Sequence, residues 1–148
     1  MEHSGLDGYR FEDLKVGMHA TVSRTITETD LRNFSGVSGD TNPMHLNEEY
    51  AATTVFGGCI VHGMLTASLI SAVIGTKLPE PGCIYMSQTL KFLAPVRVGD
   101  TVYASATVKE LLPKKKQVVL GTQCIVKDTV VIDGEALIKV PSRLSGKG

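Results

Sequence analysis

The pattern of apolar and polar positions predicts one helical block framed by strands. Residues 19–26 alternate loosely between the two kinds of side chain, which is typical of a first strand. Thr27 and Asp30 have the spacing of a capping box, so a helix is expected to begin just after Thr27. Asn47 is followed by two glutamates, and this order predicts a second, short helix with Asn47 as its N-cap.

The longest apolar segment, residues 59–78, predicts the principal helix. Its apolar residues extend around most of the helical circumference, and such a helix is either buried in a core or spans a membrane. The apolar stretch from Met64 to Ile74 is much shorter than the ~20 residues needed to cross a bilayer, and polar side chains interrupt it. We therefore expect a core helix.

After residue 81 the period changes to two, which predicts antiparallel strands. Residues 102–108 alternate clearly, and a lysine run at 114–116 predicts a hairpin into the next strand, which ends near residue 126. Residues 130–140 form a last strand in which Asp133-Gly134 indicates either a hairpin turn or a bulge. A strand, a buried helix and three or four further strands together predict an α+β layer.

Composition indicates a compact domain without a surface specialised for nucleic acid. The chain has 148 residues, with 15 basic and 15 acidic side chains and a formal net charge of zero. This length predicts one domain, and the charge balance excludes the strong basic surface of a nucleic-acid binder. We expect the domain to cover residues 14–142, between flexible terminal segments at 1–13 and 143–148.

The cysteines and the N-terminus bear on the compartment. Cys59, Cys83 and Cys124 cannot all pair, and they have neither CxxC nor His/Cys metal-ligand spacing. A reduced, intracellular protein without a metal is therefore expected, either cytoplasmic or imported into an organelle. The first residues show no basic stretch followed by an apolar one, so no secretory signal is expected.

The motif with the clearest chemistry is the stretch VSGDTNPMHL at residues 37–46. It places Asp40 and His45 five positions apart, across a turn that a glycine and a proline keep from being helical throughout. A carboxylate and an imidazole that converge suit acid/base chemistry on a water molecule. The alternative interpretation is an ordinary Asx-type turn that carries a histidine.

This stretch and the later segment FGGCIVHGM, residues 56–64, together resemble the MaoC-like, or type 2, (R)-specific enoyl-CoA hydratases. The family signature Gly-Asp-x-Asn-Pro-aliphatic-His matches residues 39–45, and a further family element, PVRVGD, occupies residues 95–100. The likeness covers about residues 14–140. There are two departures. Asn47 replaces a common Asp, and Gly58-Cys59 replaces the usual Arg-Pro or similar pair, which could alter how the thioester or pantetheine is held.

The resemblance implies a single hot-dog fold, in which a curved antiparallel sheet wraps around a long central helix, and a homodimer that extends the sheet. It also implies a lyase of fatty-acid metabolism that reversibly hydrates trans-2-enoyl-CoA to (R)-3-hydroxyacyl-CoA. The expected partners are an acyl-CoA substrate and a second copy of the chain, with no nucleic acid or membrane. No cofactor is expected beyond the coenzyme A that the substrate carries.

Three alternatives stay open from the sequence. The substrate carrier could be acyl-carrier protein, which would make the protein a (3R)-hydroxyacyl-ACP dehydratase of type II fatty-acid synthesis. A hot-dog acyl thioesterase would also use a carboxylate and water, but it generally carries that carboxylate on the long helix, and residues 59–78 contain no Asp or Glu. A catalytically silent partner subunit is the third alternative, and the intact family motif argues against it.

The resemblance also assigns roles to particular residues. It implies that Asp40 and His45 are catalytic. The backbone N–H of Gly63 is expected to stabilise the thioester oxyanion, because the first N–H groups of a helix lack intrahelical partners and a glycine allows close approach. Ser71 matches a position that supports the site, while His62 either contacts substrate or has a structural role. The turn between the two catalytic residues is expected to depend on Asn42 and Pro43.

Overall fold

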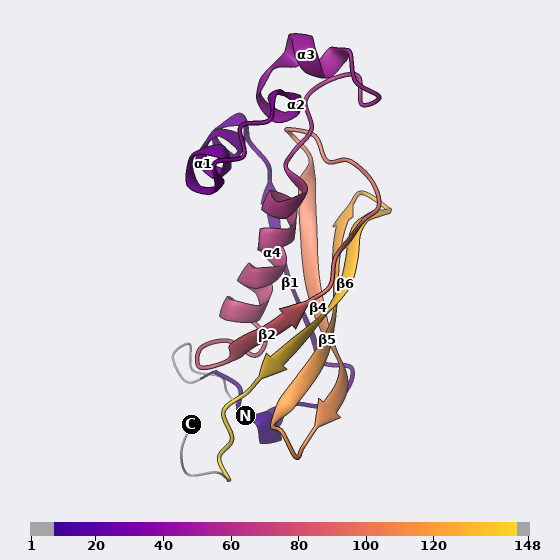
Figure 1. Ribbon diagram of the computed structural model, residues 1–148. Coiled ribbons are helices and arrows are strands. Elements are labelled where there is room, and N and C mark those ends of the chain that lie inside the picture. The colour runs from indigo at the N-terminus through magenta and orange to yellow at the C-terminus, as the bar shows by residue number, and fades with distance from the viewer. Residues whose placement is uncertain (1–7, 145–148) are drawn as a thin grey trace.

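The computed structural model describes residues 8–144, which form a curved antiparallel sheet of six strands with one long helix against it (Figure 1). In chain order the elements are η1 (Phe11–Asp13), β1 (His19–Thr25), α1 (Glu28–Ser38), α2 (Pro43–Leu46), α3 (Glu48–Ala52), α4 (Gly63–Thr76), β2 (Ile84–Gln88), β3 (Lys91–Phe92), β4 (Thr101–Leu112), β5 (Gln117–Val126) and β6 (Thr129–Lys139).

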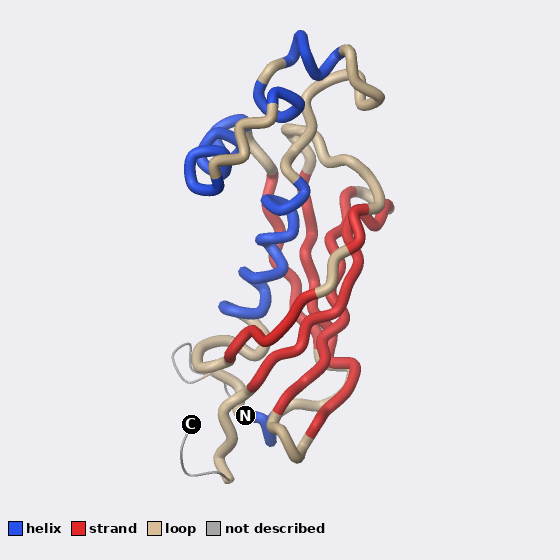
Figure 2. Tube along the Cα trace, in the orientation of Figure 1, coloured by secondary structure: helices blue, strands red, loops and turns tan. Residues whose placement is uncertain are grey.

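The sheet has the strand order β1-β4-β5-β6-β2, and the short β3 pairs with β6. The long helix α4 packs against one face of this sheet, where it contacts β1, β4 and β5. The three short helices α1, α2 and α3 gather beyond the N-terminal end of α4, whereas η1 lies at the opposite end of the molecule (Figures 1 and 2). This arrangement confirms the predicted hot-dog fold.

The core lies between α4 and the inner face of the sheet. The alternation predicted for residues 102–108 is present in β4, where Val102, Ala104, Ala106 and Val108 are buried. The two alanines leave room for the helix to approach the sheet closely. On the helix, buried apolar side chains such as Ile70 complete the contact.

The principal helix begins later than predicted, at Gly63 instead of near residue 59. The preceding residues are held in an extended path, because the Ile60 N–H donates to the Met44 carbonyl (3.2 Å) and the Val61 N–H to the Val96 carbonyl (2.7 Å). These non-local bonds hold residues 60 and 61 outside the helix. No helix within residues 8–144 is long and apolar enough to cross a membrane.

The pair Asp133-Gly134 forms neither a hairpin turn nor a bulge in the pairing of β6 with β5. Asp133 pairs with Gln123 and Gly134 with Thr122 in regular register, and the irregularity falls further along, between Cys124 and Ile125. Glycine is needed at 134 for another reason. A Cβ there would lie 1.9 Å from the carbonyl oxygen of Thr89, in the connection between β2 and β3.

The edge strand β2 has no counterpart among the predicted elements. Its sequence IYMSQ lacks a period-two pattern, and all its residues are exposed or half-buried. Only the backbone pairing with β6, from Ile84 opposite Lys139 onward, defines it as a strand. An exposed edge strand carries unpaired backbone groups that favour pairing with another chain.

The predicted flexible segment 1–13 is wrong for its last six residues. The Tyr9 N–H donates to the Pro79 carbonyl (2.9 Å) and the Phe11 N–H to the Pro141 carbonyl (2.8 Å), and the Phe11 ring is buried. At the other terminus Arg143 donates to the Asp13 carboxylate at 2.9 Å, so the ordered domain extends past residue 142. Residues 1–7 and 145–148 lie outside the described part of the chain.

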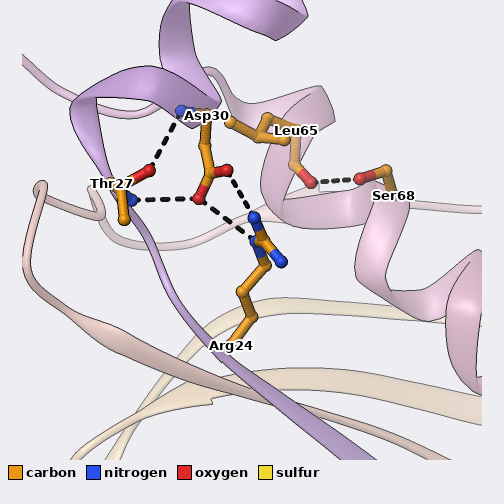
Figure 3. A network of polar contacts seen from close by, with 5 residues as sticks. All are labelled: Arg24, Thr27, Asp30, Leu65 and Ser68. Atoms are coloured by element: carbon orange, nitrogen blue, oxygen red, sulfur yellow. Dashed lines mark hydrogen bonds and ion pairs between the residues drawn. The ribbon is translucent and has the colours of Figure 1, made fainter.

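The predicted capping box at the start of α1 is confirmed (Figure 3). The Thr27 hydroxyl accepts the Asp30 N–H at 3.1 Å, and the Asp30 carboxylate accepts the Thr27 N–H at 3.0 Å. Arg24, at the end of β1, donates to both oxygens of that carboxylate, and these bonds lower the pKa of Asp30. Within α4, the Ser68 hydroxyl donates to the Leu65 carbonyl, also shown in Figure 3.

Candidate active site

The site begins where α1 ends. Gly39 is the C-cap of α1 with a φ of 80°, a left-handed conformation that glycine adopts without strain. The chain then turns through Asp40 to Asn42, whose side chain accepts the Met44 N–H at 3.0 Å and caps α2. Pro43 occupies the first turn of α2, where its missing N–H costs nothing. The single turn α2 was not predicted as a helix.

His45 lies on α2 and is buried, with 8% of its surface exposed. Its Nδ1 is 2.8 Å from the carbonyl oxygen of Ile60. A carbonyl can only accept, so Nδ1 carries the proton. In the neutral ring Nε2 is therefore a free base, which is the form that can take a proton from water.

His62, the N-cap of α4, is almost completely buried beside His45. Its Nε2 lies 3.0 Å from the Ser35 hydroxyl and 3.2 Å from the backbone carbonyl of Asp40. Its ring stacks on that of His45, with 4.0 Å between centroids and 24° between planes. Burial and the proximity of His45 lower the pKa of His62, which favours a neutral ring.

Asp40, His45 and His62 each place one side-chain N or O atom within 4.8 Å of the others. The expected convergence of Asp40 and His45 is therefore present, and the cluster combines an exposed carboxylate with two buried imidazoles. Such a set could bind either a water molecule or a transition metal. Nδ1 of His45 and Nε2 of His62 already have hydrogen-bond partners within the protein.

A cavity of about 390 Å³ opens beside His45. His45 and Thr66 are the only polar side chains among its lining residues. The remaining lining residues are Met44, Phe56, Ile60, Val61, Gly63, Phe92, Leu93, Ala94, Pro95, Val96 and Ile132. An apolar cavity next to a carboxylate and an imidazole suits a substrate with an apolar chain and a reactive polar end.

Gly63 is the first residue of α4 and also lines this cavity. The first N–H groups of a helix have no intrahelical acceptor and lie at the positive end of the helix dipole. A Cβ at position 63 would lie 2.7 Å from Cε1 of Phe92. In this structure the group that approaches Gly63 closely is the Phe92 ring, and the approach of the thioester stays a prediction.

Ser71 is not brought to the cluster within one chain. It is exposed on α4, eight residues beyond Gly63, which corresponds to about 12 Å along the helix axis. Other contacts of the site were missed from the sequence. Ser35 meets His62 although 27 residues separate them, and the Ile60 carbonyl meets His45 across 15. No local pattern marks either of these partners.

Comparison with known proteins gives the family. The model of the MaoC like domain matches residues 12–131. The chain is 57% identical over 133 residues to the (R)-specific enoyl-CoA hydratase of Rhodospirillum rubrum, covering 90% of this chain and 92% of the relative. It is 51% identical over 133 residues to the 3-hydroxybutyryl-CoA dehydratase of Methylorubrum extorquens, covering 90% and 85%.

Among solved structures, the R-hydratase PhaJ1 from Pseudomonas aeruginosa in the unliganded form superimposes with a TM-score of 0.87. It is 45% identical, and the match covers 93% of this chain and 89% of that chain. The resemblance identified from residues 39–45 and 56–64 is thus confirmed across nearly the whole sequence. The chain belongs to the MaoC-like family.

Proposed function

We propose that the protein catalyses the reversible hydration of trans-2-enoyl-CoA to (R)-3-hydroxyacyl-CoA. The observation that carries this proposal is the convergence of Asp40 and His45 beside an apolar cavity of about 390 Å³. The names of the Rhodospirillum rubrum and Methylorubrum extorquens relatives, at 57% and 51% identity, support the same reaction class.

The proposed reaction uses one water molecule held between the carboxylate of Asp40 and Nε2 of His45. The water oxygen bonds to C3 of the enoyl group while the Asp40/His45 pair takes one of its protons. The electrons of the double bond move onto the thioester oxygen, and the Gly63 N–H stabilises this enolate. The pair then returns the proton to C2, which completes the hydroxyacyl thioester. Both groups contact the same water in this proposal, so the role of base is assigned to the pair and not to one residue.

Coenzyme A is the proposed carrier, because the relatives with the higher identities are named for CoA thioesters. Acyl-carrier protein is the alternative, and relatives named for it match at 39% and 34% identity. The absence of Asp and Glu from residues 59–78 disfavours a thioesterase whose carboxylate sits on the long helix. Three free cysteines support a reducing, intracellular compartment.

We also propose a homodimer. On the edge strand β2, Ile84, Tyr85 and Met86 are each at least 40% exposed. On α4, Met64 is 56% exposed, and Ser71 shares its face because positions seven apart align on a helix. Pairing with a second copy would cover this apolar edge. It would also place Ser71 near the interface between the two copies. Substitution of Ser71 would then test whether this residue supports the site of its own chain or that of the partner.

An assay with crotonyl-CoA and longer 2-enoyl-CoAs tests the reaction. We expect loss of the enone absorbance without release of free thiol, and an (R)-3-hydroxyacyl product on chiral analysis. Release of free thiol without hydration would instead support the thioesterase. Hydration of the acyl-carrier-protein thioester at a much higher kcat/KM than the CoA thioester would reassign the carrier.

A further inference from the structure

The loop that holds the His45 ring has no regular secondary structure of its own. We call residues 56–61 the strap, since they lead directly to the N-cap of α4 and carry the Ile60 carbonyl that fixes Nδ1 of His45. The position of that carbonyl decides which nitrogen of His45 carries the proton. Whatever holds the strap therefore affects the base.

Arg97 holds the strap through two bonds from its guanidinium. Its guanidinium donates to the Cys59 carbonyl at 3.3 Å and to the Phe56 carbonyl. The backbone of Arg97 is itself fixed in a turn, because its N–H donates to the Asp100 carboxylate (2.9 Å) and its carbonyl accepts the Asp100 N–H (3.0 Å). A planar guanidinium with several donors in fixed directions can join two carbonyls in this way, which a lysine ammonium does less well.

Glu48 and Gly58 complete the arrangement. Both carboxylate oxygens of Glu48, on α3, lie 3.4 Å from the Cys59 nitrogen. Cys59 therefore contacts the Glu48 carboxylate through its N–H and the Arg97 guanidinium through its carbonyl. A Cβ at position 58 would lie 3.4 Å from the Arg97 guanidinium and 3.5 Å from the Glu48 carboxylate. These are ordinary contact distances, so the strap passes directly between the two side chains at Gly58.

We infer that Arg97 is a positioning residue that holds the strap so that Ile60 keeps His45 in the Nδ1–H form. The inference rests on the proposed function, since it concerns the base of that reaction. Arg97 is not among the residues that line the cavity, so its effect on catalysis is indirect and passes through the strap, which carries the Ile60 carbonyl. A shift of that carbonyl by about 1 Å would misplace the base and slow the reaction by up to about 100-fold.

Substitutions of Arg97 test this role by kinetics. Arg97→Met keeps much of the aliphatic length of the side chain and removes its N–H donors. Arg97→Lys keeps the positive charge but lacks the planar guanidinium that can join two carbonyls. We expect both to lower kcat with crotonyl-CoA by about 10- to 100-fold and to change KM little. Free guanidinium should restore part of the activity of Arg97→Ala. Arg32→Met is the matched control, because it removes an exposed arginine on α1 that forms an ion pair with Glu28 at the surface.

A spectroscopic measurement separates positioning from general damage. The chain has four histidines, so nitrogen-15 NMR can assign His45 by comparison with His45→Gln. We expect the Nδ1–H tautomer in the wild type and a mixture of tautomers in folded Arg97→Met and Arg97→Lys. An unchanged tautomer, or a kcat equal to that of Arg32→Met, would overturn the inference. A wild-type protein that hydrates no enoyl thioester would overturn the proposed function, while the tautomer would still test Arg97.

Discussion

At the scale of single residues, the proposed reaction requires Asp40 and His45 to act on the same water. Asp40→Asn and His45→Gln each keep the approximate shape of the side chain but remove its ability to take a proton. Each should lower kcat by at least ~100-fold. Because the two act as one unit, the double variant should be little slower than either single variant. Multiplied losses in the double variant would show that the residues work separately, and wild-type rates would remove both from the mechanism.

His62 links the stability of the fold to pH. Burial and the nearby His45 lower the pKa of His62 below its ordinary value of 6.5. The unfolded chain then binds a proton that the folded protein rejects, so the free energy of unfolding decreases as the pH falls through about 6.5. Denaturant unfolding should therefore show a loss of stability between about pH 7.5 and 5.5 that is smaller in His62→Gln. Identical losses in the two proteins would argue against a buried neutral His62.

At the scale of elements, the start of α4 offers a test with an internal control. Gly63→Ala places a methyl where the Phe92 ring now lies, 2.7 Å away, and a displaced ring enters or reshapes the cavity. Because Phe92 is 53% exposed and free to move outward, the fold should survive while kcat/KM falls by about tenfold or more.

Gly75→Ala is the control for this substitution, because a Cβ at Gly75 meets no atom within 4 Å. It should leave activity unchanged and stabilise the helix by up to about 1 kcal/mol, since glycine is a poor residue inside a helix. Thermal melting and steady-state kinetics of the two variants give the comparison. Full activity in Gly63→Ala would remove Gly63 from the proposed site.

The elements also show where sequence reasoning is reliable for this chain. The alternation in β4 and the capping box at Thr27 depend on neighbouring residues, and both were predicted correctly. The start of α4 was placed too early because bonds from the strap to Met44 and Val96 lie outside any local window. In the site, the turn that joins Asp40 to His45 could be predicted from neighbouring residues in the sequence. The contact of Arg97 with Phe56, across 41 residues, could not.

At the scale of the whole molecule, the exposed edge at β2 predicts a dimer in solution. Met86→Lys places a charge on this apolar edge, where Met86 is 50% exposed, and should shift the protein towards a monomer. Val16→Lys changes a residue that is 64% exposed and lies outside the strands, so it should leave the oligomeric state unchanged. Sedimentation equilibrium measures both variants against the wild type. A wild-type protein with the mass of one chain would show that β2 is not an interface.

In the proposed reaction one water, held by Asp40 and His45, supplies both the hydroxyl and the proton to one face of the enoyl group. Hydration of crotonyl-CoA in deuterium oxide, followed by stereochemical analysis at C2 and C3, tests it most directly. We expect an (R)-3-hydroxyl group and a deuterium added to C2 on the same face. Deuterium on the opposite face, or an (S) product, would contradict it.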